Sequence, residues 1–276
     1  MIPAPAPGLY ADVPMDVYHT WAAANSSSLK RIASHSPAHV RWDLDHQGEP
    51  TEAQRVGSAT HECVLQPDLF ARNCVRGIEG DGRTKAVREA RENLAREHPG
   101  AHVLAPAEYD LCVSLRDAVA SHRVASRLLQ GQPEQSGVWV DPETGVLCKG
   151  RFDLLSDKTP TVVDLKTARD ASREAFERAI WTYGYHLQAA HYLSGANELG
   201  YVAQHFAFVA IEKVPPFCVA VYDLEPAVLA AAAEALRPLY ETWARCERDG
   251  IWPGYSERVE SIGIPEWAFR RMEAGA

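Results

Sequence analysis

The sequence lacks three features that would indicate other classes of protein. Its six cysteines are scattered among 276 residues without a C-x-x-C pair, which argues against a zinc ribbon and against a disulfide framework. No apolar run approaches the roughly 20 residues of a membrane span, and residues 1–8 have neither the basic nor the apolar region of a secretion signal. We therefore expect a cytoplasmic protein with free buried thiols and no membrane association.

Positive charge is also scarce. The 28 lysine and arginine residues are outnumbered by 37 acidic ones, and the net charge of -9 is opposite to the basic footprint expected of a nucleic-acid-binding protein. Residues 26–41, however, contain no acidic residue, and a locally basic channel on an acidic body could still steer DNA. The candidate DNA contacts are Ser27, Lys30, Arg31, Lys149 and Arg151.

Two apolar segments carry charged residues that need an explanation. Residues 146–155 and 162–167 have the apolar, partly β-branched character of adjacent strands, and a turn-like segment, residues 156–160, separates them. Asp164 and Lys166 stand at positions i and i+2. On a strand, both side chains would project from one face.

This arrangement predicts a metal site. Asp153 and Asp164 could supply the oxygen ligands that Mg²⁺ takes when it also binds a substrate phosphate. Lys166 would lie beside metal-bound water, where an amine can orient or deprotonate the water and offset charge on a scissile phosphate. The alternative is a salt bridge on an exposed edge strand. The apolar flanks of both strands favour the metal site.

Further motifs occur in order along the chain. They are Asn25–Leu29, Ser36–His39, Gly57–His61, Asp164–Thr167, Tyr183–Ala190 and Trp252–Tyr255. The D…D-x-K pattern of residues 153–166 is shared with the PD-(D/E)XK nuclease superfamily. Together with the other motifs, it resembles the RecE-type exonuclease VIII family, which is related to the RecB and lambda-exonuclease branches, from about residue 10 to about residue 268.

The resemblance implies which residues hold the metal. His61 matches a motif histidine that a helix contributes to the site, and Gly57, one helical turn earlier, is consistent with close approach of that helix to the sheet. Asp153 and Asp164 match the metal-binding acids, and Lys166 matches the catalytic lysine. The cofactor is expected to be Mg²⁺ or Mn²⁺. The expected metal ligands are His61, Asp153, Asp164 and Leu165.

Three more residues gain a role from the resemblance. Gln188 and Tyr192 match a Q-x-x-x-Y element of the RecB-like branch, and at i and i+4 of a helix both can face one cleft. The alternative is a polar patch on an amphipathic helix. Glu134 resembles the acid that begins the first core strand and can contact the metal through water. The predicted catalytic residues are Glu134, Asp153, Asp164, Lys166, Gln188 and Tyr192.

The expected fold class is α/β, with a restriction-endonuclease-like PD-(D/E)XK core in which helices flank a central mixed sheet. We expect one domain over residues 1–276, with a helical elaboration at 1–130, the catalytic core at 131–225, and a final helix and tail at 226–276. The pattern predicts helices near 26–36, around Gly57 and His61, and at 84–98, 106–129, 172–194 and from 226. It predicts strands near 137–140, 146–155, 161–165, 203–212 and 217–222.

The resemblance implies a metal-dependent 5′-to-3′ exodeoxyribonuclease that resects linear double-stranded DNA and leaves 3′ overhangs for recombination. It also implies three partners, namely double-stranded DNA ends, a RecT-like annealing protein and further copies of the chain in a ring. Two alternatives stay open. One is a non-catalytic descendant that binds DNA or protein, and the other is an endonuclease or repair nuclease of the same superfamily.

Overall fold

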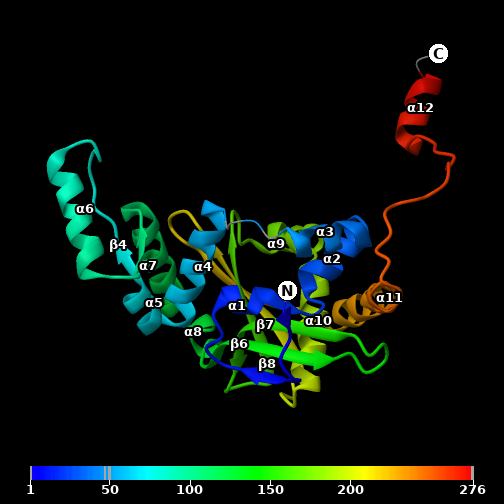
Figure 1. The fold of residues 1–276 in the computed structure, drawn as a ribbon, viewed down its shortest axis with the longest axis horizontal. Coiled ribbons are helices and arrows are strands. Elements are labelled where there is room, and N and C mark those ends of the chain that lie inside the picture. The colour runs from blue at the N-terminus through cyan, green and yellow to red at the C-terminus, as the bar shows by residue number, and fades with distance from the viewer. Residues whose placement is uncertain (1, 47, 49–50, 275–276) are drawn as a thin grey trace.

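A six-stranded β-sheet forms the centre of the molecule (Figure 1). The computed structural model describes residues 2–46, 48 and 51–274. Strands β8 and β9 are parallel and every other neighbouring pair is antiparallel, so the predicted mixed sheet is confirmed. The strands lie in the order β10 (Val219–Asp223), β9 (His205–Glu212), β8 (Thr161–Ala168), β7 (Leu147–Ser156), β6 (Gly131–Val140) and β2 (Gly8–Tyr10).

Helices cover both faces of the sheet, because its strands alternate apolar side chains between two cores. On β9, Phe206 and Phe208 belong to the first core, whereas Val209 and Ile211 belong to the second. The first core is closed by α2 (Ser26–Ser34), α3 (Pro37–Asp45), α9 (Arg173–Thr182), α10 (Tyr185–Glu198) and α11 (Pro226–Asp249). The second is closed by α4 (Glu52–Leu65), α7 (Pro106–Ser121) and α8 (Ala125–Leu128).

The remaining elements extend this core. Figure 1 places α6 and α12 at opposite ends of the molecule, and neither helix has a buried residue. Within the described part of the chain, no helix is both long and apolar enough to cross a membrane. The elements are β1 (Ile2–Pro3), α1 (Met15–Thr20), β3 (Trp21–Ala22), α5 (Pro67–Asn73), β4 (Cys74–Arg76), α6 (Lys85–Glu97), β5 (His102–Leu104) and α12 (Glu266–Ala274).

Two long helices predicted from the sequence are each divided in the structure. The segment 106–129 breaks at His122 into α7 and α8. The segment 172–194 breaks at Gly184, which has a positive φ of 63° and precedes α10. A residue with a side chain rarely adopts this backbone conformation, so glycine permits the turn.

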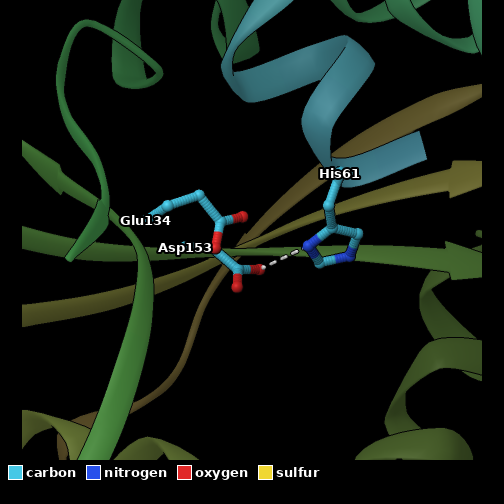
Figure 2. A group of neighbouring side chains, drawn as sticks. All are labelled: His61, Glu134 and Asp153. Carbon is cyan, nitrogen blue, oxygen red and sulfur yellow. Dashed lines mark ion pairs between the residues drawn. The ribbon is translucent and has the colours of Figure 1, made fainter. Parts of the chain in front are cut away.

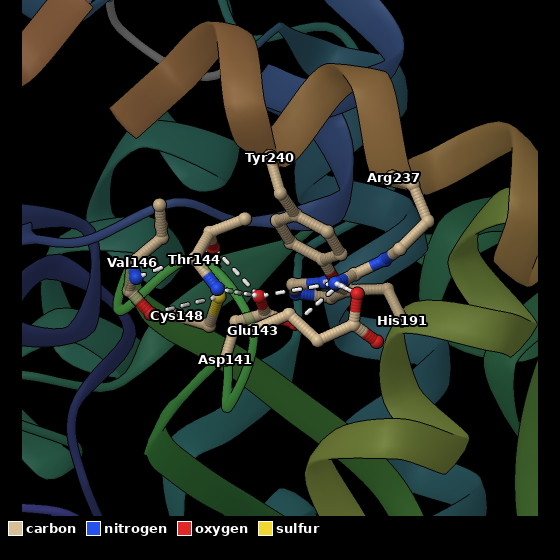
Figure 3. A network of polar contacts seen from close by, with 8 residues as sticks. All are labelled: Asp141, Glu143, Thr144, Val146, Cys148, His191, Arg237 and Tyr240. Carbon is tan, nitrogen blue, oxygen red and sulfur yellow. Dashed lines mark hydrogen bonds and ion pairs between the residues drawn. The ribbon is translucent and has the colours of Figure 1, made fainter. Parts of the chain in front are cut away.

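A buried polar network joins α10 and α11 to the hairpin of β6 and β7 (Figure 3). Asp141 accepts a hydrogen bond from Arg237 at 2.6 Å. The ring of His191 lies 2.6 Å from the Tyr240 hydroxyl and 3.1 Å from the backbone carbonyl of Lys149. Because a carbonyl only accepts, Nε2 of His191 carries the proton and Nδ1 accepts. Burial lowers the pKa of His191 to about 4, so the ring is neutral and fixes α10 against β7.

The two helical glycines at positions 57 and 195 have opposite environments. A Cβ at Gly195 would lie 2.5 Å from the buried Trp139 ring, whereas nothing lies within 4 Å of a Cβ at Gly57. The expectation that Gly57 allows close approach of α4 to the sheet is therefore wrong, since this position faces open space.

We predict that Gly195→Ala lowers the free energy of unfolding by about 1–3 kcal/mol, because overpacking forces the Trp139 ring or α10 to move. The matched variant Gly57→Ala should instead raise it by about 1 kcal/mol, because alanine favours a helix over glycine. Urea unfolding of both variants measures the difference. Equal effects of the two substitutions would contradict the packing of α10 on Trp139.

Candidate metal-dependent active site

The site begins where β7 and β8 separate. Their paired residues are Leu154 with Val163 and Leu155 with Val162, and the next residues along the two strands are Asp153 and Asp164. The alternation of β7 also changes phase here, because Phe152 packs in the first core and Leu154 in the second. A regular strand would place both residues on one face. The two acids therefore stand at the fork of the strands.

Opposite Asp153, β6 is distorted as well. Glu134 has a positive φ of 50° and is missing from a register that pairs Pro133 with Leu154 and Gln135 with Phe152. Such a conformation is uncommon for a residue with a side chain and marks a local constraint. It brings a third carboxylate to the fork.

Asp164 and Lys166 project from the same face of β8, as their spacing predicts. Lys166 Nζ lies 2.5 Å from Asp164 Oδ2, and the Asp164 side chain is only 1% exposed. The Gln188 amide on α10 donates to Asp164 Oδ1 at 2.8 Å. The polar-patch alternative for Gln188 is therefore wrong, because this side chain reaches the site.

Asp153 bridges the gap between the separated strands. Its Oδ2 accepts a hydrogen bond from the backbone N–H of Leu165 at 2.7 Å and lies 3.5 Å from Nδ1 of His61. The Leu165 side chain is buried in the second core. Any contribution of Leu165 to a metal would therefore come from its backbone, and that role stays a prediction.

Three side chains from three separate elements meet at one point (Figure 2). His61 on α4, Glu134 on β6 and Asp153 on β7 each offer a ligand atom within 4.8 Å of the other two. Asp164 is outside this group, and its carboxylate contacts Lys166 and Gln188 instead. The resemblance implied that Glu134 contacts the metal through water, whereas its carboxylate lies within 4.8 Å of the ligand atoms of His61 and Asp153.

This donor set fits a divalent cation. Carboxylate oxygens are ligands for Mg²⁺, and imidazole suits Mn²⁺. In addition, the buried Oδ2 of Asp164 has no hydrogen-bond partner of acceptable geometry in the described chain, although Lys166 contacts it. His61, Glu134 and Asp153 therefore form a candidate metal centre, and Asp164 is near enough to Asp153 to raise its pKa.

Burial and mutual charge perturb the ionisable groups. Burial raises the pKa of Asp153 from 3.8 to about 7, and the negative charge of Asp164 adds to this effect while His61 opposes it. For Lys166, burial opposes the charged form, but Asp164 and Asp153 outweigh it and raise the pKa of the amine. Lys166 is therefore an ammonium at neutral pH.

Two predicted DNA contacts are used inside the protein and need correction. Lys149 is 2% exposed, and its ammonium donates to the backbone carbonyls of Tyr18, His19 and Trp21 at 2.7–3.3 Å. Arg151 donates to Glu134 at 2.6 Å. Both cations hold neighbouring segments in place, so neither is free to bind phosphate.

The remaining predicted DNA contacts lie on α2. Ser27 is exposed at the start of the helix. Lys30 donates to the backbone carbonyl of Tyr183 at 3.2 Å, and burial together with the charge of Lys166 lowers its pKa, so it lies near the site. Arg31 forms an ion pair with Asp43 at 3.0 Å, which neutralises part of the basic segment. Their contact with DNA stays a prediction.

Tyr192 lies deeper than Gln188. Its ring packs edge-on against Phe152 at 5.3 Å, and it is 8% exposed. Burial raises the pKa of its hydroxyl, and the charges of Tyr18, Asp164 and Asp153 raise it further. Tyr192 thus remains a neutral phenol near both acids, and a catalytic role for it stays a prediction.

The role of Arg151 as the partner of Glu134 was not predicted from the sequence. The two residues are 17 positions apart, and they become neighbours only through the antiparallel register of β6 and β7. The available signal was the resemblance of Glu134 to the acid that begins the first core strand, together with an arginine on the next expected strand.

Known proteins share the fold of this chain. Residues 25–264 match the family model described as a PDDEXK-like domain of unknown function (DUF3799). No curated protein matches. A crystal structure of a candidate exonuclease from Eubacterium rectale is 13% identical and covers 97% of this chain and 100% of its own, with a TM-score of 0.61, which indicates a shared fold.

A second solved structure, a phage-related exonuclease from Haemophilus somnus 129PT, is also 13% identical. It covers 81% of this chain and 95% of its own, with a TM-score of 0.32.

We predict that Asp153→Asn stabilises the metal-free protein at about pH 8. The raised pKa means that the folded protein holds a proton that the unfolded chain releases, so wild-type stability falls as pH rises from about 4 to about 7. Asparagine removes this loss. Urea unfolding in a chelator at about pH 8 and pH 4 measures it, and the advantage should vanish at the lower pH.

Asp141→Asn is the matched control for this pH series. Burial alone would raise the pKa of Asp141, but hydrogen bonds from Arg237 and Thr144 lower it overall. Its charged form is therefore stabilising above about pH 4, and this variant should be less stable than wild type at about pH 8. If both variants lost stability there, the interpretation of the Asp153 environment would be refuted.

His61→Ala should weaken Mn²⁺ binding more than Mg²⁺ binding, because imidazole is a better ligand for manganese. Calorimetric titration of each ion into the wild type and the variant at constant pH measures the change without any activity assay. His102→Ala, which removes an exposed histidine from β5, is the control. Unchanged affinity for both ions in a correctly folded His61→Ala protein would remove His61 from the site.

Proposed function

Because the chain belongs to the PDDEXK-like domain family, whose core is the PD-(D/E)XK nuclease fold, we propose that it is a metal-dependent deoxyribonuclease. One observation carries the proposal. The Asp164–Lys166 pair lies on one face of β8 at the fork where Asp153 and the helix-borne His61 converge. An acid pair, a lysine and an imidazole around one point are suited to hydrolysis of a phosphodiester bond.

Each residue of the site has its own role in the proposed reaction. His61, Asp153, Asp164 and Glu134 would hold Mg²⁺ or Mn²⁺, which supplies Lewis-acid polarisation of a phosphate oxygen and a more acidic bound water. Gln188 orients Asp164 through its amide hydrogen bond. Lys166 carries a raised pKa, so its role is to donate hydrogen bonds and offset phosphate charge, because an ammonium cannot accept a proton.

The finer assignment rests on the sequence resemblance to RecE-type exonucleases. We propose that the substrate is a linear double-stranded DNA end, that cleavage proceeds 5′ to 3′ in the cytoplasm, and that the resulting 3′ overhang passes to a RecT-like annealing protein. A homo-oligomeric ring around the duplex would keep the enzyme on DNA between cuts. Lys30 and Ser27, on the helix next to the site, are the proposed contacts with the phosphate backbone.

Digestion of linear, nicked and circular duplexes with Mg²⁺ or Mn²⁺ tests the activity and the strand polarity together. Separate 5′ and 3′ labels on the linear duplex identify the degraded strand. We expect loss of the 5′ label from linear DNA and survival of the closed circle. Cleavage of the closed circle would favour an endonuclease, and no cleavage of any form would favour a non-catalytic descendant.

Lys166→Met should lower turnover by about 100-fold or more while Mn²⁺ binding persists, because methionine keeps the length of the side chain but removes its charge. Initial rates beside a calorimetric metal titration separate these two effects. Lys158→Met, at an exposed position in the turn between β7 and β8, is the control and should cleave like wild type. A loss of metal affinity equal to the loss of rate would make Lys166 a structural partner of the acids.

A further inference from the structure

The end of α9 and the turn that leads into α10 present an unusual group of aromatic rings. Trp181 is 78% exposed and Tyr183 is 61% exposed. The Trp181 ring stacks on His186 at 5.3 Å with an interplanar angle of 9°. Burial of apolar area does not explain why two large aromatic side chains face solvent in one turn.

The same turn is attached to the catalytic lysine. The Lys166 ammonium lies 4.9 Å from the centre of the Tyr185 ring, and that ring lies 5.5 Å from the ring of Tyr183. Lys30 donates to the Tyr183 carbonyl at 3.2 Å. The exposed Tyr183 ring therefore adjoins the proposed active site through Tyr185, and two cations, Lys166 and Lys30, lie beside this segment.

The turn depends on Gly184. Its φ of 63° lies in the left-handed region that glycine adopts at little cost, and a Cβ there would lie 2.8 Å from Cδ of Lys30. The turn therefore places Tyr183 beside the Lys30 side chain of α2.

We propose that Tyr183 and Trp181 form a stacking platform for the nucleobases of the strand that is cleaved, a proposal that rests on the deoxyribonuclease function above. Bases expose flat π faces and stack on aromatic side chains without regard to sequence, while nearby cations contact the phosphates. A strand that reaches the Lys166–Asp164 pair at its scissile phosphate would carry its neighbouring bases past Tyr183. The platform would hold the terminal nucleotides apart from their paired strand.

The experiment pairs substitutions in the protein with removal of bases from the DNA. Tyr183→Leu and Trp181→Leu remove the rings, and Tyr183→Phe keeps the ring but loses the hydroxyl. Trp267→Leu removes an equally exposed tryptophan from α12, away from the sheet, and is the matched control (Figure 1). The substrates are one linear duplex and the same duplex with abasic residues at the terminal positions of the cleaved strand.

For the wild type, abasic ends should raise KM by about five- to a hundredfold, the range that corresponds to loss of stacking on one ring. Tyr183→Leu and Trp181→Leu should each raise KM for the normal duplex by a similar factor and should be less sensitive to abasic ends than the wild type, because one of the two rings remains. Tyr183→Phe should keep the sensitivity to abasic ends, because its ring remains, whereas Trp267→Leu should behave like wild type. Full abasic sensitivity in Tyr183→Leu and Trp181→Leu would overturn the proposal.

Two further measurements distinguish base stacking from protein docking and test the platform apart from the nuclease activity. Sedimentation should show the same assembly state for Tyr183→Leu and Trp181→Leu as for the wild type. Smaller species, combined with the abasic sensitivity of the wild type, would make this segment a protein-docking surface instead. Anisotropy of a labelled single-stranded oligonucleotide with Ca²⁺ measures binding without cleavage. If the wild type cleaves no DNA but its binding of the oligonucleotide is weakened by Tyr183→Leu, the nuclease function is refuted and the platform is kept. If the substitutions do not change binding, the platform is refuted.

Discussion

The separation of β7 from β8 beyond the Leu154–Val163 pair is the constraint on which the rest of the site depends. Two strands that stayed paired would satisfy their backbone groups with each other. Here the N–H of Leu165 bonds to the carboxylate of Asp153 instead, so the side chain replaces the missing strand partner. The fork thereby creates the space at which an imidazole and further carboxylates can meet. Glu134, with its left-handed backbone, reaches the same point from β6, which lies on the other side of β7.

The cost of gathering acids at the fork is offset by groups brought from distant segments. Arg151 neutralises Glu134, and Lys166 neutralises Asp164. Lys149, four positions before Asp153 on β7, is buried and donates to three carbonyls of the N-terminal segment, which attaches that segment to β7. A buried ammonium without such partners would be strongly unfavourable. Several of the few lysine and arginine residues of this acidic chain are therefore used in its interior. Burial lowers the pKa of Lys149 to about 8.

Sequence patterns predicted the parts of this arrangement that are local. The i, i+2 spacing of Asp164 and Lys166 on an apolar strand sufficed to place both on one face, and the mixed α/β fold is confirmed. The use of Lys149 could not be predicted, because its partners are main-chain carbonyls about 130 positions away. The turn at Gly184 was missed because a periodic helical pattern continues across it, whereas a positive φ breaks the helix. Glu134 reaches His61 only through a backbone distortion that no residue pattern specifies.

The buried pair of Asp164 and Lys166 also argues against a purely structural explanation of the site. An ion pair of this kind contributes little net stability, because desolvation of two charges largely cancels their attraction. The salt bridge considered from the sequence would lie on an exposed edge, yet β8 is an interior strand between β7 and β9. Apolar residues could fill such a place with equal or better stability. A buried carboxylate that is held against a lysine is instead suited to a site that exchanges this partner for a metal ion.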